Sequence, residues 1–134
     1  MAGKLLDAKL CMGSSIGVAI GHQSADIGQK SVAVFGDSAF YHSGINALIQ
    51  ARFSNKTLLA IILDNGGAVT TGNQPTPDKN GVPIVDLIQT CQVDKMWIIE
   101  ECDDEATMRS IFYQALSSPD GLYAIVIRKK CRPV

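Results

Sequence analysis

The stretch SVAVFGDSAFYHSGINALIQARFSNKTLLAIILDNGG, residues 31–67, decides the fold of this chain. Residues 31–35 and 58–63 are two short apolar runs, and the second is apolar on both faces. Such runs are typical of strands in a parallel sheet that helices cover on both sides. Between them, residues 43–53 predict a helix with one apolar face. That face carries Ile45, Leu48, Ile49 and Phe53. The stretch therefore predicts a strand, a crossover helix and a second strand parallel to the first.

The same alternation continues on both sides of this stretch. Apolar runs at 96–99 (MWII) and 122–127 (LYAIVI) predict two more strands. Helical patterns cover residues 12–27, 84–91 and 104–116, and Asp103 or Asp104 is a plausible N-cap for the last helix. This order predicts an α/β fold, a three-layer sandwich with a mostly parallel sheet and right-handed crossovers.

Length and composition are those of an ordinary globular domain. The chain has 134 residues, 46% of them hydrophobic, and we expect one domain over residues 1–134. The net charge of −1 favours neither nucleic acid nor an anionic membrane. The basic cluster Arg128-Lys129-Lys130 with Arg132 is expected to be a solvated strand end. No signal peptide or membrane-spanning run is expected, so the predicted location is the cytoplasm.

Cysteines, histidines and other isolated side chains are expected to be structural. Cys11, Cys91, Cys102 and Cys131 contain no C-x-x-C pair, which disfavours zinc and iron–sulfur sites and favours reduced thiols. Packing is expected for Met12, Met96 and Trp97, and capping or solvation for Glu100, Glu101 and Glu105. His22 is expected to have no role at a site.

One segment interrupts the alternation of strands and helices. Residues 66–83, GGAVTTGNQPTPDKNGVP, are too long for a passive connection between a strand and a helix. Loops of this length in compact domains are usually binding loops or lids. A merely mobile excursion is the alternative interpretation.

Polar residues follow directly after the first two predicted strands. Gly36-Asp37-Ser38 ends one strand and Asp64-Asn65 ends the next. Ligands of open α/β sheets bind beyond the carboxyl ends of the strands, so both motifs fall at the expected edge. Asp37 offers a carboxylate oxygen, Asn65 an amide oxygen and Gly67 a backbone carbonyl, which are ligands that Mg²⁺ accepts. The pattern predicts a magnesium site, with Gly36 and Ser38 beside a diphosphate near a helix N-terminus.

Together these motifs resemble the signature of thiamine-diphosphate enzymes, Gly-Asp-Gly followed about one crossover later by Asn-Asn. The stretches CMGSSIGVAIG (11–21), VAVFGDSAFYHSGINALIQA (32–51) and IILDNGGAVTTGNQPTP (61–77) resemble the 2-oxoacid:ferredoxin oxidoreductases, particularly the indolepyruvate:ferredoxin oxidoreductase alpha subunit. The resemblance implies a thiamine-diphosphate-binding fold. It implies Asp37, Asn65 and Gly67 as magnesium ligands. The implied cofactor-binding residues are Met12, Gly13, Ser14, Gly36, Asp37, Ser38, His42 and Asn65.

The resemblance also implies a function that needs a partner. Family members decarboxylate a 2-oxo acid oxidatively to an acyl-CoA, and ferredoxin takes the electrons. The chain corresponds to the pyrophosphate domain, truncated at its N-terminal side. We expect a homo- or hetero-oligomer in which a partner subunit or domain supplies the pyrimidine-binding half, and no activity from the chain alone. The alternative is a non-catalytic remnant that serves as an assembly module through an exposed sheet edge or apolar face. A flavodoxin-like mononucleotide binder is a weaker third interpretation.

Overall fold

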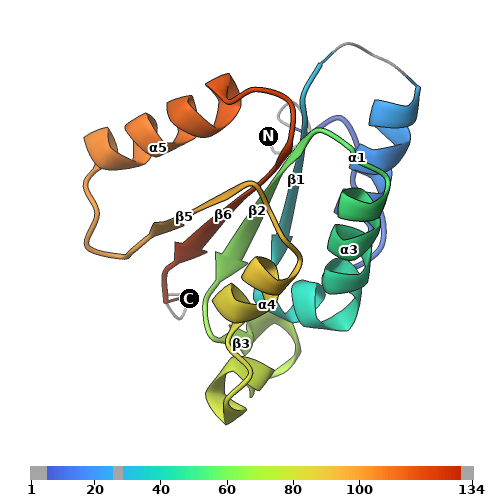
Figure 1. Cartoon of the computed structure of the whole chain (residues 1–134). Helices are drawn as coiled ribbons and strands as arrows, with labels where there is room; N and C mark the ends of the chain where they lie inside the picture. The colour runs from blue at the N-terminus through green and yellow to red at the C-terminus, as the bar shows by residue number, and fades with distance from the viewer. Residues whose placement is uncertain (1–5, 26–28, 131–134) are drawn as a thin grey trace.

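The computed structural model describes residues 6–25 and 29–130 (Figure 1). Cys131, Arg132 and the expected end of the first helix at 26–27 lie outside the described residues. The elements alternate helix and strand in the predicted order. Each predicted strand is present, within a residue or two of its expected ends.

The sheet has four parallel strands in the order β1-β2-β6-β5. Their bounds are Ser31–Gly36 for β1, Leu58–Asp64 for β2, Leu122–Arg128 for β6 and Lys95–Ile99 for β5. The register places Gly36 beside Leu63 and Asp64 beside Arg128. Because all four strands run the same way, their carboxyl ends meet at one edge. The two motif-bearing strands, β1 and β2, are neighbours in the sheet.

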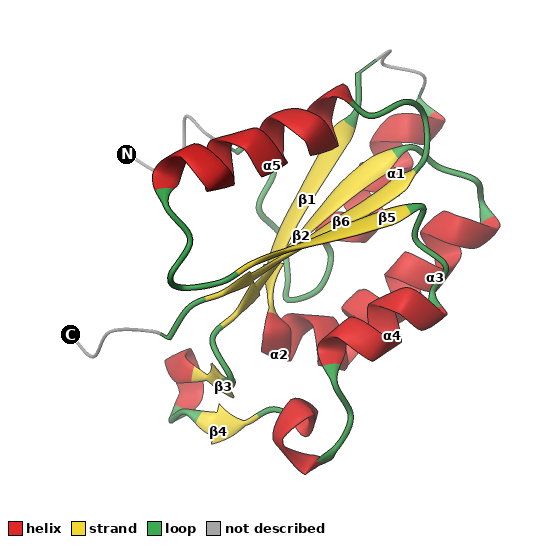
Figure 2. Ribbon diagram, turned by 60° about the vertical axis from the view of Figure 1, so that its left-hand side comes forward, coloured by secondary structure: helices red, strands yellow, loops and turns green. Residues whose placement is uncertain are grey.

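Helices cover both faces of this sheet, as expected for three layers (Figures 1 and 2). One face packs against α1 (Ser15–Ser24), α3 (Ile45–Phe53) and α4 (Ile84–Thr90), and the other packs against α5 (Glu105–Ser117). Asp104 caps α5 by accepting a hydrogen bond from the Thr107 N–H at 2.6 Å, as predicted.

Burial on both faces explains why residues 58–62 of β2 are all apolar. Leu58, Ala60 and Ile62 belong to the core under α1, α3 and α4, whereas Leu59 and Ile61 belong to the core under α5. Both sets are buried, so the strand is shared by two cores. Complete burial of each Leu or Ile side chain contributes about 1.5–3 kcal/mol, which holds the carboxyl end of β2 firmly in place.

The helix after β1 differs from its prediction in start and orientation. It begins at Asp37 as α2 (Asp37–Ala39), continues through a π-helical turn at Phe40–Gly44 and runs into α3. The buried stripe is Gly44, Leu48 and Ala51, so Ile49 and Phe53, expected on the buried face, are 52% and 84% exposed. The earlier start puts the first helical turn directly on the Gly36-Asp37-Ser38 motif.

The first helix is shorter than the prediction of 12–27, because α1 begins at Ser15. Gly13 has a φ of +78°, a left-handed conformation that no helical residue adopts, and the Ser14 N–H bonds back to the Cys11 carbonyl. A turn therefore occupies residues 11–14.

The edge strand β1 leaves apolar residues uncovered. Val32 and Val34 are 44% and 41% exposed on the side away from α1. This agrees with the expectation of an exposed apolar sheet face. Among the described residues, no helix has the length and apolar character needed to cross a membrane.

Candidate cofactor site

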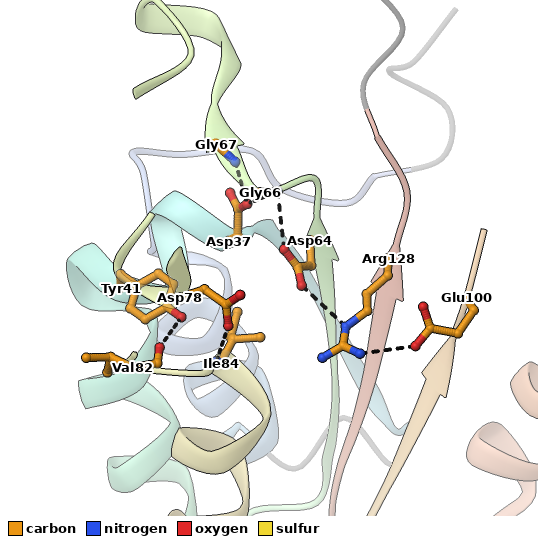
Figure 3. Close-up of polar contacts among 10 residues, drawn as sticks. All are labelled: Asp37, Tyr41, Asp64, Gly66, Gly67, Asp78, Val82, Ile84, Glu100 and Arg128. Atoms are coloured by element: carbon orange, nitrogen blue, oxygen red, sulfur yellow. Dashed lines mark hydrogen bonds and ion pairs between the residues drawn. The ribbon is translucent and has the colours of Figure 1, made fainter. Parts of the chain in front are cut away.

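Both sequence motifs meet at the carboxyl edge of β1 and β2 (Figure 3). Asp37 follows β1 at the start of α2, and its side chain points toward the turn that follows β2. Asp64 ends β2, and Asn65, Gly66 and Gly67 form that turn. The structure thus brings together the two predicted strand ends in the way that the register of β1 and β2 requires.

Asp37 is the centre of this arrangement and is only 3% exposed. Its Oδ1 accepts hydrogen bonds from the Ser38 N–H and, at 3.1 Å, from the Ser38 hydroxyl. Its Oδ2 accepts hydrogen bonds from the Gly66 N–H at 2.9 Å and the Gly67 N–H at 3.2 Å. Within the described residues Asp37 has no ion-pair partner. A buried, unpaired carboxylate is costly unless hydrogen bonds or a cation compensate it.

Asn65 and Gly67 lie beside this carboxylate. The Asn65 Oδ1 accepts a hydrogen bond from the Gly67 N–H at 3.1 Å, so the amide oxygen lies next to the group that also contacts Asp37. Gly67 is buried, and a Cβ there would come within 2.6 Å of the Asn73 Oδ1. A larger residue here would therefore require the Asn73 side chain to move. The role of the Gly67 carbonyl as a ligand stays a prediction.

Asp64 is partly buried beside Asp37, and the pKa of its carboxyl group is raised. Burial is the largest cause, followed by the negative charges of Asp37 and Asp78. The Gly66 N–H and Arg128 act in the opposite direction. The Arg128 Nε lies 3.6 Å from the Asp64 Oδ2, and its guanidinium also binds Glu100 at 3.1 Å. The sequence interpretation missed this role and treated Arg128 as a solvated strand end.

Met12, Gly13 and Ser14, which were predicted to bind the cofactor, lie beside the helix that carries Asp37, near Ser43. A Cβ on Gly13 would overlap the Ser43 Oγ, and that hydroxyl lies 3.4 Å from the Met12 carbonyl and 3.2 Å from the His42 Nδ1. The turn therefore packs against the helix that carries Asp37. Met12 is 56% exposed, so the expectation that it packs in the core is wrong. His42 is also exposed, and its side chain contacts Ser43 rather than Asp37.

A cavity of about 610 Å³ adjoins the same turn. Its walls include Met12, Gly13, Ser14 and Gly36, together with the exposed valines of β1. Asp37, Asn65 and Gly67 do not line it. Except for His42, the predicted cofactor residues thus divide into a polar cluster at the strand ends and a group along this cavity, and Gly36 connects the two.

The long segment 66–83 lies beyond the carboxyl edge of the sheet (Figure 2). It contains a small antiparallel ribbon of β3 (Gly67–Ala68) and β4 (Gln74–Pro75) and two 3-10 turns at Val69–Thr71 and Pro77–Asn80. The Asp78 Oδ1 accepts a hydrogen bond from the Ile84 N–H at 3.1 Å, and the Tyr41 hydroxyl donates to the Val82 carbonyl at 2.7 Å. This segment therefore has structure of its own and contacts the helix that carries Asp37.

The remaining predictions concern the other isolated side chains. Trp97 packs against the core under α5, Met96 packs against the core on the other face, and Cys91 is buried. Cys11 and Cys102 are exposed free thiols. Glu100 pairs with Arg128 and Glu105 with Arg109, in agreement with solvated acidic positions. His22 is exposed.

The donor set suits magnesium better than a transition metal. In the described part of the chain, no three His, Cys, Asp or Glu side chains converge as they would around zinc. Magnesium needs fewer protein ligands, because water and phosphate oxygens complete its octahedral shell. One buried carboxylate with an amide oxygen beside it fits that requirement, and the Ser38 hydroxyl and nearby N–H groups fit a phosphate.

Comparison with known proteins gives a consistent result. The profile of the family "Thiamine pyrophosphate enzyme, C-terminal TPP binding domain" matches residues 5–126. The indolepyruvate oxidoreductase subunit IorA of Archaeoglobus fulgidus is 30% identical over 94% of this chain and 21% of its own length. That of Methanothermobacter marburgensis is 37% identical over 66% of this chain and 16% of its own length. The resemblance predicted from the motifs is confirmed, although the chain spans only about a fifth of these relatives.

A solved structure shows the same fold. It is a putative thiamin diphosphate-dependent enzyme from Mycobacterium smegmatis, with a TM-score of 0.67 and 19% sequence identity. The alignment covers 91% of this chain and 23% of that chain. At this identity the likeness supports the fold of the chain and nothing about its ligands.

Proposed function

The chain belongs to the family of C-terminal thiamine pyrophosphate (thiamine diphosphate, TPP) binding domains, and we propose that its strand-end turns at 36–38 and 64–67 hold the diphosphate of TPP through Mg²⁺. Asp37 and Asn65 would ligate the ion through their side chains and Gly67 through its carbonyl. Gly36 and Ser38 would contact the diphosphate. Met12, Gly13, Ser14 and His42 would lie along the rest of the cofactor.

The observation that carries this proposal is the buried carboxylate of Asp37. It lies at the carboxyl edge of a parallel sheet, 3% exposed and without an ion-pair partner among the described residues. A bound cation would compensate this charge. The Ser38 hydroxyl is the most easily moved of its donors, because it sits on a rotatable side chain, whereas the other donors are backbone N–H groups. Rotation of that hydroxyl would free an oxygen of Asp37 for the metal and direct the hydroxyl to a phosphate.

TPP supplies a nucleophilic carbon that adds to the carbonyl of a 2-oxo acid and then accepts electrons after loss of CO₂. The described residues of this chain would contribute binding and orientation. Asp37 and Asn65 would fix the metal, the first turn of the continuous helix that begins at Asp37 would favour the negative diphosphate, and Gly67 would let the chain approach the cofactor. No described side chain here matches the glutamate that the family uses to activate the pyrimidine ring.

For the protein as a whole, we propose a 2-oxoacid:ferredoxin oxidoreductase of the indolepyruvate type, acting in the cytoplasm. It would convert a 2-oxo acid to an acyl-CoA together with a subunit or domain that supplies the pyrimidine-binding half, in a homo- or hetero-oligomer. The relatives named indolepyruvate oxidoreductase support this proposal. The uncovered valines of β1 give such a partner an apolar surface to contact.

Isothermal titration calorimetry with TPP and Mg²⁺ tests the proposed site. We expect saturable heat with the wild-type chain and at least about tenfold weaker binding with Asp37→Asn, because loss of one charge-assisted contact costs roughly 1.5–3 kcal/mol. Glu101→Gln removes an exposed carboxylate at the same edge of the sheet and is expected to bind as wild type does. Unfolding midpoints measured in urea check that each variant is folded.

Two results would refute the site. One is equal affinity of the wild-type chain and Asp37→Asn. The other is TPP binding that does not depend on Mg²⁺. If the folded wild-type chain gives no heat even with a pyrimidine-domain partner, the alternative of an assembly module replaces the proposal.

A further inference from the structure

Three adjacent strand ends carry charges of alternating sign beside the proposed cofactor site. Asp64 ends β2, Arg128 ends β6, and Glu100 follows β5 (Figure 3). The Arg128 Nε lies 3.6 Å from the Asp64 Oδ2, and its Nη1 lies 3.1 Å from the Glu100 Oε1. Glu100 and Arg128 are 48% and 40% exposed at their side chains, whereas Asp64 is only 11% exposed. Of the two carboxylates that pair with Arg128, the more buried one, Asp64, is therefore the one nearer the site.

Both oxygens of Asp64 are occupied, and the two contacts point in different directions. Oδ2 faces Arg128, and Oδ1 accepts a hydrogen bond from the Gly66 N–H at 3.3 Å. The same N–H donates to the Asp37 Oδ2 at 2.9 Å. A chain of contacts thus runs from Arg128 through Asp64 and Gly66 to Asp37. Gly66, with a φ of +78°, is the point at which the backbone turns into the site.

Arg128 is also the only cation that pairs with this group of carboxylates in the described part of the chain. An unrestrained Asp64 carboxylate would be a strong competing ligand for a divalent ion, because charged oxygens are preferred over amide oxygens. The contact with Arg128 keeps Asp64 directed toward β6. The backbone of β6 is held separately, since the Lys129 N–H donates to the Asp64 carbonyl at 3.0 Å.

We propose that Arg128 is a positioning residue for the cofactor site. By holding Asp64, it fixes the Asn65–Gly67 turn against Asp37 and keeps a second carboxylate out of the metal position. Arg128 acts through Asp64 and does not itself contact the cofactor. The link to the cofactor rests on the proposed function, whereas the contacts that fix the turn exist in the chain without any ligand.

The first experiment uses the ligand-free chain. Amide hydrogen exchange measured by NMR reports the Gly66 and Gly67 N–H groups directly. Arg128→Gln is expected to speed their exchange by about threefold to tenfold, the range that a partly buried ion pair supports. Amides in the middle of β2, such as that of Ile61, are expected to exchange as in the wild type. Arg128→Lys restores a cation and is expected to recover most of the protection.

Arg109→Gln is the matched control, because it breaks an exposed ion pair with Glu105 on α5, far from the turn. It is expected to leave Gly66 and Gly67 unchanged. Unchanged exchange at both glycines in Arg128→Gln would overturn the proposal. Equal acceleration at Ile61 and the glycines would overturn it too, since that result indicates only a general loss of stability.

The second experiment is a double-mutant cycle read by calorimetry with TPP at saturating Mg²⁺. Arg128→Gln is expected to weaken TPP binding by at least about threefold in the wild-type background. In the Asp64→Asn background its effect is expected to be under about twofold, because the neutral amide that replaces the carboxylate needs no cation and still accepts from Gly66. Equal effects in both backgrounds would refute action through Asp64. If wild type binds no TPP even with a pyrimidine-domain partner, the proposed function fails, while the exchange experiment still decides the role of Arg128.

Discussion

Gly13 offers a quantitative test of how the first turn of the chain packs against the site. Its φ of +78° costs a residue with a Cβ roughly 1–2 kcal/mol. The added methyl group of Gly13→Ala would overlap the Ser43 Oγ and lie 3.3 Å from the Ala39 carbonyl oxygen. Ser43 must then rotate and lose its contact with the Met12 carbonyl, which is worth roughly 0.5–1.5 kcal/mol. We expect Gly13→Ala to lower the free energy of unfolding by about 1.5–3.5 kcal/mol, the sum of the two effects.

Urea denaturation followed by circular dichroism measures this change. Gly21→Ala is the matched control, because Gly21 lies inside α1 with open space where its Cβ would be. That substitution is expected to stabilise the chain by roughly 0.5–1 kcal/mol through helix propensity. In a Ser43→Ala background, the loss from Gly13→Ala is expected to shrink, because the overlap with the Ser43 Oγ is gone and only the close contacts with the residue-43 Cβ and the Ala39 carbonyl remain. Wild-type stability of Gly13→Ala, or an equal loss from Gly21→Ala, would refute the reasoning.

Two further predictions concern residues that support the two faces of the sheet. Lys30 donates to carbonyls at the end of α5, including that of Ser118 at 2.7 Å, and lies 4.8 Å from the Tyr123 ring centre. Lys30→Met is expected to lower the free energy of unfolding in urea by about 1 kcal/mol, and an equal loss from the exposed Lys130→Met would contradict this. The pKa of Tyr41 is raised from its usual value near 10 to about 12. Burial is the main cause, and the negative charges of Asp78 and other nearby carboxylates add to it. The fold thus favours the protonated hydroxyl, so this stability is present below pH 10 and is lost as the pH rises toward 12. Measured against Tyr41→Phe, the advantage of the wild type should shrink over this range, and a constant difference would contradict it.

The fold was largely predictable because its strands bury both faces. Residues 58–63 have no polar side chain, and such a run is stable only between two layers. The orientation of α3 was not predictable in the same way. Ile49 and Phe53 read as core residues, yet Gly44, Leu48 and Ala51 face the sheet. A Cβ at Gly44 would lie 3.2 Å from the Phe35 ring, so the choice of face depends on how closely the helix approaches β1.

The residues of the candidate site that belong to the two sequence motifs were predictable. Asp37 and Asn65 follow directly from two neighbouring strand ends, because parallel strands bring their carboxyl ends together. The hydrogen bonds from Gly66 and Gly67 to Asp37 depend on the conformation of a turn, which residue types alone do not determine. The role of Arg128 was missed because it comes from a strand more than sixty positions away. The sequence feature that could have indicated this ion pair is the pair of seven-residue runs LLAIILD and LYAIVIR, which end in opposite charges.

The environment of Asp64 shows that the site also depends on β6, a strand that carries none of the motif residues. A carboxylate 11% exposed beside the buried Asp37 experiences both desolvation and repulsion. Arg128 offsets part of that cost only because β6 lies next to β2 with Asp64 directly opposite Arg128. A one-residue slip of β6 would turn every side chain of the strand to the other face and remove the ion pair. The packing of Leu122, Ala124 and Val126 on one face and Tyr123 and Ile125 on the other fixes that register. The apolar core of the sheet therefore determines the charge balance at its edge.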